Sequence, residues 1–136
     1  MAKIIFASHG DLAKGMKNSV SMIAGSLADD VETYCLYPGE NPTDYYQELR
    51  ERVQECQDQV IILADIKGGS VHTALMPLTV FENVVLISGM NMAMALDVVL
   101  QYREGIQESE FDALITGSQS GITLMHGIKE QEDEEF

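Results

Sequence analysis

The sequence predicts an α/β fold: an open, mostly parallel sheet of four strands with helices on both faces and a possible antiparallel edge strand. Short apolar runs alternate along the chain with longer stretches whose apolar residues recur at helical spacing. The short runs are continuously apolar, which is typical of parallel strands buried on both faces. At 136 residues, the chain fits one domain, 1–136, with a single core.

The first strand and helix are expected at the N-terminus. Lys3–Ser8 is a continuous apolar run of strand length, and Asp11–Ala24 follows as a helix that Gly25 can end. The apolar residues at helical spacing in that helix are Leu12, Met16, Val20 and Ile23.

A second strand is expected over Glu32–Tyr37. The loop "PGENPTDYY" then supplies Asn41 as an N-cap and Pro42 at the first helical position, so a helix should run to about Glu55. The run "QVIILA", residues 59–64, is the most hydrophobic of the expected strands.

The second half of the chain repeats the alternation. The expected elements are a short helix over Ser70–Val80, a strand over Asn83–Ser88 and helices over Asn91–Tyr102 and Glu108–Thr116. The run "GITLMHG", residues 121–127, is interpreted as the possible short edge strand. The acidic end, about 130–136, is expected to be a solvated, loosely ordered tail.

The composition narrows the class of protein. A net charge of −14 argues against a nucleic-acid partner, because no basic patch could offset phosphate repulsion. No apolar run approaches the ~20 residues that span a bilayer, and the N-terminus lacks a signal-peptide cleavage site. Cys35 and Cys56 lie in apolar contexts without a CxxC pattern and are interpreted as buried free thiols of a cytoplasmic protein.

Three of the expected strands end alike, in "FASHG", "LADIKGGS" and "LISGMN". Each closes on a small polar or acidic residue and is followed within a few positions by glycine and a helix start. In an open parallel sheet, ligands gather at the carboxyl ends of the strands, near the point where strand order reverses. The residues that these turns would bring to one site are His9, Asp65, Ser70 and Asn91.

His9 and Asp65 are the candidate catalytic pair. A neutral imidazole has one nitrogen lone pair free to attack, and a carboxylate on the other ring N–H fixes the tautomer and the direction of the ring. The same carboxylate stabilises the positive charge that a substituted ring carries. If the first and third strands are neighbours, Asp65 lies within reach of His9.

The glycines of the turns indicate an anion site. Gly10, Gly68 and Gly69, with Ser70, could present backbone N–H groups and a hydroxyl to phosphoryl oxygens. No arginine lies near an expected strand end. A site that binds phosphate tightly would use arginine, so its absence there favours transient phosphorylation of the histidine. No metal or cofactor is expected, since no ligand cluster is visible. A rim that would contact a partner protein is assigned to Lys67, His72, Met90 and Asn91.

Three stretches, "SHGDLAKGMKNSVSMIAG", "LADIKGGSVHTAL" and "SGMNMAMALDVV", together resemble the IIA component of the mannose class of the bacterial sugar phosphotransferase system. The resemblance implies a phosphoryl relay in which the phosphocarrier protein HPr donates to His9 and a IIB component accepts from it. The membrane components IIC and IID then import the sugar. By position, Asp65 matches the family's orienting carboxylate and Ser70 its GGS serine, and the family is typically dimeric.

The sequence departs from the family's pattern at two places. After "GGS" the family usually continues Pro-Phe/Tyr-Asn, where this chain has Val71-His72-Thr73. After the asparagine the family commonly has Leu/Ile-Pro-Met, where this chain has Met92-Ala93-Met94. Both departures fall at the rim, so the IIB surface that is recognised and the sugar stay open.

Two other functions remain alternatives. A receiver-like signalling domain would be phosphorylated on Asp65, although it would need an acidic pair where this chain has Ser8-His9. A histidine phosphatase also places His-Gly at a strand end, although it needs phosphate-clamping arginines. A nucleotide-binding module is less compatible, because no GxGxxG pattern or Walker lysine follows the first strand.

Overall fold

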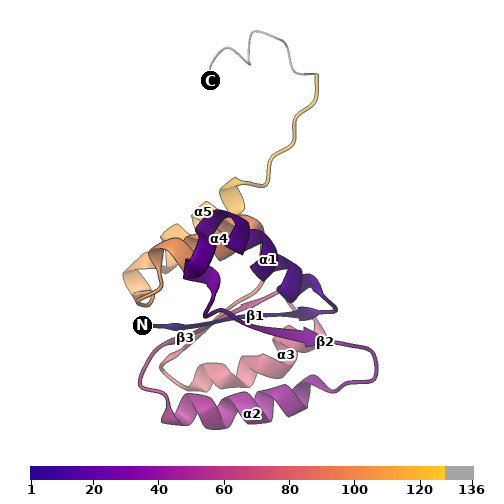
Figure 1. Cartoon of the computed structure of the whole chain (residues 1–136), viewed down its shortest axis with the longest axis vertical. Helices are drawn as coiled ribbons and strands as arrows, with labels where there is room; N and C mark the ends of the chain where they lie inside the picture. Colours follow the sequence, from indigo (N-terminus) through magenta and orange to yellow (C-terminus); the bar gives the residue numbers. More distant parts are fainter. Residues whose placement is uncertain (128–136) are drawn as a thin grey trace.

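The computed structural model describes residues 1–127 and confirms the α/β class (Figure 1). Four parallel strands form one open sheet, and helices cover both of its faces. The strands are β1 (Lys3–His9), β2 (Glu32–Leu36), β3 (Val60–Ala64) and β4 (Val84–Ile87). The helices are α1 (Leu12–Ala24), α2 (Pro42–Glu55), α3 (Ser70–Leu75), α4 (Met92–Gln101) and α5 (Phe111–Ser120).

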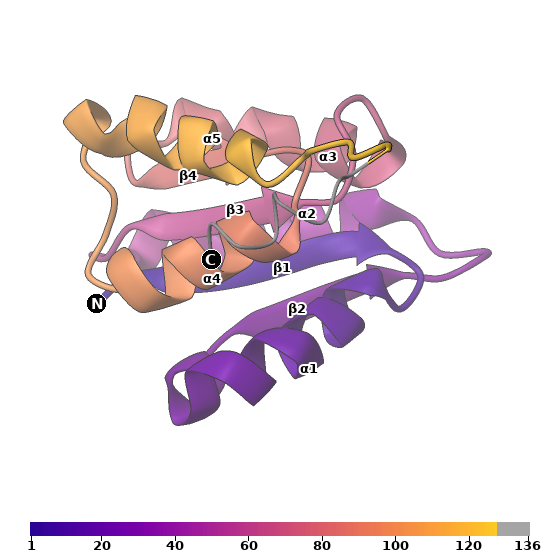
Figure 2. The ribbon, with the colours of Figure 1, turned by 90° about the horizontal axis from the view of Figure 1, so that it is seen from above.

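The order of the strands, β2-β1-β3-β4, places β1 and β3 at the centre (Figure 2). The chain passes from β1 to β2 on one side and later places β3 on the other side, so strand order reverses between β1 and β3. Ala7 of β1 pairs with Ala64 of β3, and these two strands therefore end side by side. The crevice expected at such a reversal lies beyond these two ends.

The sheet separates two apolar cores. Ile4 and Phe6 pack into the core beneath α1, α4 and α5, whereas Ile5 and Ala7 pack into the core that α2 and α3 cover. Figure 1 shows the same two layers of helices on opposite sides of the strands. Successive strand residues point to opposite faces, so a strand buried on both faces must be apolar throughout, as β3 is.

Local sequence signals explain the start of α2. The Asn41 side chain accepts a hydrogen bond from the Thr43 N–H at 3.0 Å, and Pro42 is the first helical residue. The predicted cap and helix bounds are confirmed.

The predicted apolar face of α1 was partly wrong. Val20 is buried as expected, together with Ala13, whereas Leu12 is 50% and Ile23 64% exposed. The stripe that faces the core follows Ala13 and Val20. Leu12 lies about 100° around the helix from Ala13, and Ile23 lies about 60° from Val20 toward the same side, so both face outward.

The C-terminal region corrects two expectations. A 3₁₀ turn (Glu108–Glu110) precedes α5, which extends the expected helix to Ser120. Residues 121–127 form no strand and run away from the body of the molecule (Figure 1), so the antiparallel edge strand was wrong. Their apolar side chains have no sheet edge of the same chain beside them: Ile122 is 77% and Leu124 89% exposed. The expected loose tail at 130–136 lies outside the described residues.

The structure also describes the two cysteines and the lengths of the apolar helices. Cys35 and Cys56 are free thiols; Cys35 is buried and Cys56 half-buried. Among residues 1–127, no helix is both long and apolar enough to cross a membrane.

Candidate functional site

The ends of β1 and β3 bring His9 and Asp65 together. His9 is the last residue of β1, and Asp65 directly follows β3. The ring Nδ1 of His9 lies 2.8 Å from Asp65 Oδ2, and the backbone N–H of His9 donates to the same oxygen at 2.8 Å. The other carboxylate oxygen accepts from the Ile66 N–H at 2.9 Å. Three donors therefore fix the carboxylate, and the carboxylate fixes the imidazole.

This geometry assigns the tautomer of His9. An ionised carboxylate only accepts hydrogen bonds, so Nδ1 carries the proton and Nε2 holds the lone pair. Ser70 Oγ lies 2.9 Å from Nε2 and donates its proton to that lone pair. The His9 side chain is 46% exposed, whereas that of Asp65 is 8% exposed. A nucleophilic nitrogen is thus open to an incoming group, and its orienting acid is shielded.

Two opposing effects act on the pKa of Asp65. Burial raises it, but the hydrogen bonds from the His9 backbone, the His9 ring and Ile66 outweigh burial and hold the pKa below its ordinary value of 3.8. A depressed pKa in the folded state means that the unfolded chain binds the proton more readily. Asp65 therefore stabilises the fold above pH 3.8, and this contribution is lost as the pH falls through the lower folded-state value.

Acid titration should reveal this contribution. We expect the difference in unfolding free energy between the wild-type protein and Asp65→Asn to be largest at neutral pH and to shrink as the pH falls below 3.8. Urea unfolding at a series of pH values measures it. Groups common to both proteins cancel in the difference, so a gap that stays constant with pH would contradict the assignment.

The turn from β1 to α1 is held from both sides. Gly10 adopts φ +55°, which favours glycine, and its N–H donates to the Leu36 carbonyl at 2.7 Å. The buried Ser8 side chain accepts from the Ala13 N–H at 2.7 Å and so fixes the first turn of α1. This role of Ser8 was not predicted, because Ser8 lies three residues before the N-cap Asp11, outside the position at which a capping serine is expected.

The turn from β3 to α3 is also closed by internal hydrogen bonds. Gly68, at φ +80°, donates its N–H to His72 Nδ1 at 3.1 Å, and the Gly69 N–H donates to the Ile66 carbonyl at 3.2 Å. Gly10, Gly68 and Gly69 were predicted to offer free N–H groups to phosphoryl oxygens. In the structure all three N–H groups donate within the chain, and the glycines shape the two turns. Their contact with a phosphoryl group stays a prediction.

Gly69 lies against the imidazole itself. A Cβ atom at this position would lie 3.1 Å from His9 Cε1 and 2.7 Å from Cγ2 of Ile66. Its φ of −69° suits any residue, so close approach to the ring, and not backbone conformation, calls for glycine here.

The predicted partner-binding rim is only partly at the surface. Lys67 is exposed and His72 half-buried, but Met90 is 7% exposed, so its prediction as a surface residue was wrong. The Met90 N–H donates to the Ala64 carbonyl at 2.9 Å, which extends the strand pairing and turns the side chain into the core. The Asn91 amide accepts from the Met94 N–H at 2.8 Å and donates to the Ser118 carbonyl at 2.8 Å. Its polar atoms hold α4 and α5 together.

A hollow beside His9 escaped the sequence analysis. It has a volume of about 470 Å³ and is lined by His9, Gly10 and residues 36–40. At its edge the Tyr37 hydroxyl donates to Asp11 Oδ1 at 2.6 Å and accepts from Lys14 Nζ at 3.2 Å. The hydrogen bond to Asp11 raises the pKa of Tyr37 above its ordinary value. These contacts join residues far apart in the chain, so no local pattern signals them.

The comparison with known families shows the family of the chain. The family described as "PTS system fructose IIA component", in which PTS stands for phosphotransferase system, matches residues 3–115. The chain belongs to this family of mannose-class IIA components. It is therefore part of the phosphotransfer chain of sugar uptake, as a phosphoryl carrier.

Individual relatives agree with the family assignment. The chain is 33% identical over 101 residues to the sorbose-specific EIIA component of Klebsiella pneumoniae, and the match covers 73% of each protein. The mannose/sorbose-specific IIA subunit of Enterococcus faecalis superposes with a TM-score of 0.79 at 25% identity, covering 94% of this chain and 97% of that one. The EIIA component of Streptococcus agalactiae gives 0.78 at 27% identity, covering 91% and 97%.

Proposed function

We propose that Nε2 of His9 accepts a phosphoryl group from phosphorylated HPr and passes it to a IIB component. The membrane components IIC and IID then take up the sugar, and the exchange takes place in the cytoplasm. The observation that carries this proposal is the pair of contacts on the ring: Asp65 Oδ2 lies 2.8 Å from Nδ1, and Ser70 Oγ lies 2.9 Å from Nε2. Membership of the family supports the direction of the relay.

The phosphoryl group passes from one imidazole nitrogen to another, and His9 does not have to lose a proton in this step. The lone pair of His9 Nε2 forms the new N–P bond as the N–P bond to the donor imidazole breaks, and the donor nitrogen keeps the electron pair. His9 retains its Nδ1 proton, so the phosphorylated ring is positively charged and the Asp65 carboxylate stabilises it. The Ser70 hydroxyl then turns from Nε2 to a phosphoryl oxygen. The N–H groups of Ser70 and Val71, in the first turn of α3, have no acceptor within the helix and can assist.

The two alternatives fit the geometry less well. A receiver-like domain needs a carboxylate open to attack, but both oxygens of Asp65 accept hydrogen bonds and its side chain is 8% exposed. A phosphatase needs guanidinium groups on the phosphate, but Arg52 instead pairs with Glu32 on β2, and its Nη1 lies 3.0 Å from the Glu32 carboxylate.

One experiment separates all three functions. The protein is incubated with enzyme I, HPr and labelled phosphoenolpyruvate, and the modified residue is mapped by mass spectrometry. We expect one phosphoryl group on His9, stable in alkali and lost in acid. An alkali-labile label on Asp65 would support the receiver alternative, and release of inorganic phosphate without a retained label would support the phosphatase.

Substitution of Gly69 tests the close approach to the ring. Gly69→Ala should slow phosphorylation of His9 by about tenfold, because the new methyl group displaces Ile66 and pushes on the imidazole, and small misplacements of reacting groups cost up to ~10²-fold in rate. Rapid-quench labelling with phosphorylated HPr measures the rate. Gly15→Ala, on α1 with open space around it, is the matched control. Equal rates for the two variants would contradict the role of Gly69.

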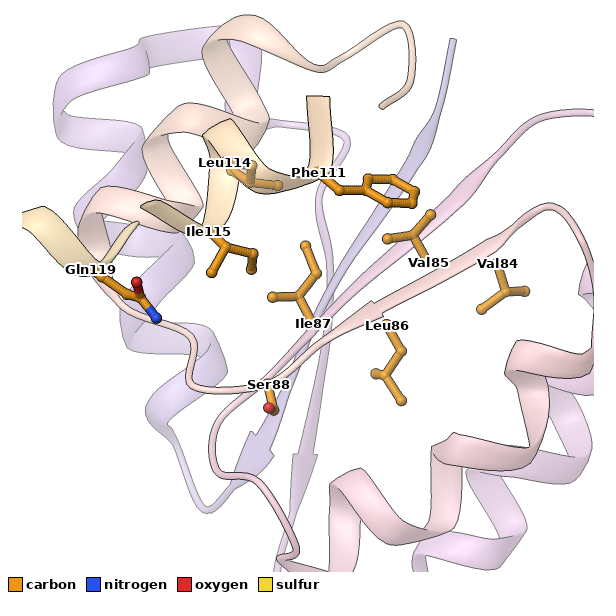
Figure 3. Close-up of a pocket in the computed structure, with 9 residues that line it drawn as sticks. All are labelled: Val84, Val85, Leu86, Ile87, Ser88, Phe111, Leu114, Ile115 and Gln119. Atoms are coloured by element: carbon orange, nitrogen blue, oxygen red, sulfur yellow. The ribbon is translucent and has the colours of Figure 1, made fainter. Parts of the chain in front are cut away.

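We also propose that the chain is a homodimer. An open hollow of about 580 Å³ lies between β4 and α5, and its walls include Val85, Ile87, Phe111 and Ile115 (Figure 3). Residues 121–127 carry exposed apolar side chains and could cover this edge on a second copy. Exposed apolar surface next to an unpaired strand edge supports association between copies.

The state of association can be tested directly. We expect the wild-type protein to sediment as a dimer and the variant Leu124→Asp to shift toward monomer, because the change places a charge in the proposed contact. Analytical ultracentrifugation over a concentration series measures the shift. Met22→Asp, at an exposed apolar residue on α1, is the control. A monomeric wild-type protein would overturn the proposal.

A further inference from the structure

The residues that follow the GGS turn make contacts that the phosphoryl transfer does not itself use. His72 Nδ1 accepts from the Gly68 N–H at 3.1 Å, and Thr73 Oγ1 lies 3.4 Å from the Gly68 carbonyl, to which it donates. Two side chains of α3, those of His72 and Thr73, therefore contact the N–H and the carbonyl of Gly68 in the preceding turn. Gly68 is the residue of that turn with positive φ, +80°.

We infer that His72 is a positioning residue for the transfer: its Nδ1 holds the Gly68 turn and thereby keeps the Ser70 hydroxyl on Nε2 of His9. Consecutive contacts connect His72 with Nε2 of His9. The Gly68 N–H is fixed by His72, Gly69 packs on the His9 ring, and Ser70 Oγ lies 2.9 Å from Nε2. The inference rests on the proposed function, since positioning has meaning only if Nε2 of His9 reacts.

The turn needs this support at Gly68, although α3 beyond it is anchored by the buried Val71 and Leu75 and by the Thr73 N–H, which donates to the Gly69 carbonyl at 2.9 Å. Gly68 is exposed, so water competes for its N–H. The neighbouring Gly69 N–H makes a bond of 3.2 Å to Ile66, which itself is 58% exposed. Without His72, the turn would therefore sample conformations in which Ser70 leaves the imidazole.

The contact with the Gly68 N–H also determines the tautomer of the neutral His72 ring. An N–H donor faces Nδ1, so this nitrogen must hold a lone pair, and the neutral ring carries its proton on Nε2. Asparagine places an amide oxygen close to the position of Nδ1, whereas glutamine places its amide close to Nε2. Asparagine can therefore replace the acceptor that the turn requires, and glutamine cannot.

The first test needs no phosphoryl donor. In the unphosphorylated full chain, ¹⁵N NMR should show His72 as the Nε2–H tautomer, with a scalar coupling across the hydrogen bond from the Gly68 amide nitrogen to Nδ1. In His72→Ala, the Nε2 resonance of His9 should shift, because the Ser70 hydroxyl no longer stays on it. A proton on Nδ1 of His72 in the neutral ring, or an unchanged His9 resonance in the variant, would overturn the inference.

The second test compares rates of His9 phosphorylation by phosphorylated HPr. We expect His72→Ala and His72→Gln to lower the rate at saturating HPr by about tenfold and His72→Asn to restore most of it, with His126→Ala, an exposed histidine, as control. Equal rates for Ala, Asn and wild type would overturn the inference, as would equal losses in all three variants. A wild-type protein that takes no label would instead overturn the proposed function, and the NMR result would still decide the turn contact.

Discussion

Replacing His9 with alanine is expected to abolish phosphorylation. The variant loses the Nε2 lone pair that is proposed to attack phosphorus, and removing the nucleophile of a covalent mechanism costs up to ~10⁶-fold in rate. The fold should survive, because the His9 side chain is 46% exposed and its backbone N–H still donates to Asp65. We expect the unfolding free energy to change by no more than about 1 kcal/mol. Labelling with phosphorylated HPr and urea unfolding measure the two effects.

The variant His9→Gln tests whether the nitrogen lone pair, and not merely a polar side chain at this position, is required. Glutamine keeps a polar group near the position of Nε2 and can still contact Ser70, but an amide nitrogen has no available lone pair and cannot accept the phosphoryl group. Labelling should be as low as in the alanine variant, whereas His126→Ala should label like the wild type. A label retained in either His9 variant, at any residue, would show that the phosphoryl acceptor lies elsewhere.

The arrangement of the strands was predictable because it depends on simple rules. A continuous apolar run buried on both faces is typical of a parallel strand, and successive β-α units bring the carboxyl ends of those strands to one edge. These rules place His9 and Asp65 at the same edge of the sheet, and the pairing of β1 with β3 makes them neighbours. Asn41 and Pro42 likewise determine the start of α2 through their own local chemistry.

The failed predictions depended on contacts between distant or flexible groups. Glycine N–H groups in a turn look available in a sequence, but the Gly68 N–H is engaged by a histidine ring four residues later. Met90 seemed to belong to a surface turn, yet one backbone hydrogen bond to Ala64 carries the strand pairing past β4 and buries its side chain. Alternating apolar residues at 121–127 resemble a strand, but a strand also needs a free edge within reach of its own chain.

Substitution of Asp65 should produce the second-largest loss and should separate charge from geometry. In Asp65→Asn, one carboxylate oxygen becomes an NH₂ donor. If the amide oxygen faces His9, it still accepts from the backbone N–H and from Nδ1, and only the contact with the Ile66 N–H becomes repulsive. The opposite orientation would conflict with both donors of His9. The oxygen should therefore face His9, and the ring should keep its tautomer.

Toward His9, the asparagine variant then lacks only the negative charge that stabilises the phosphorylated ring, and on its other side it loses the hydrogen bond from the Ile66 N–H. We expect phosphorylation to slow by ~10- to 100-fold, the usual cost of removing an outer hydrogen-bond partner of a reactive histidine. Asp65→Ala also frees the ring to rotate and to exchange tautomers, so its loss should be larger, on the order of 10²- to 10⁴-fold.

Rapid-quench labelling gives the rates, and ¹⁵N NMR of His9 gives the tautomer of each variant. The Nδ1–H form should persist in Asp65→Asn and give way to a mixture of tautomers in Asp65→Ala. Wild-type rates in the asparagine variant would show that the charge of Asp65 does not contribute to transfer. Equal losses in both variants, with the same tautomer, would show that the carboxylate acts through its charge alone and does not hold the ring.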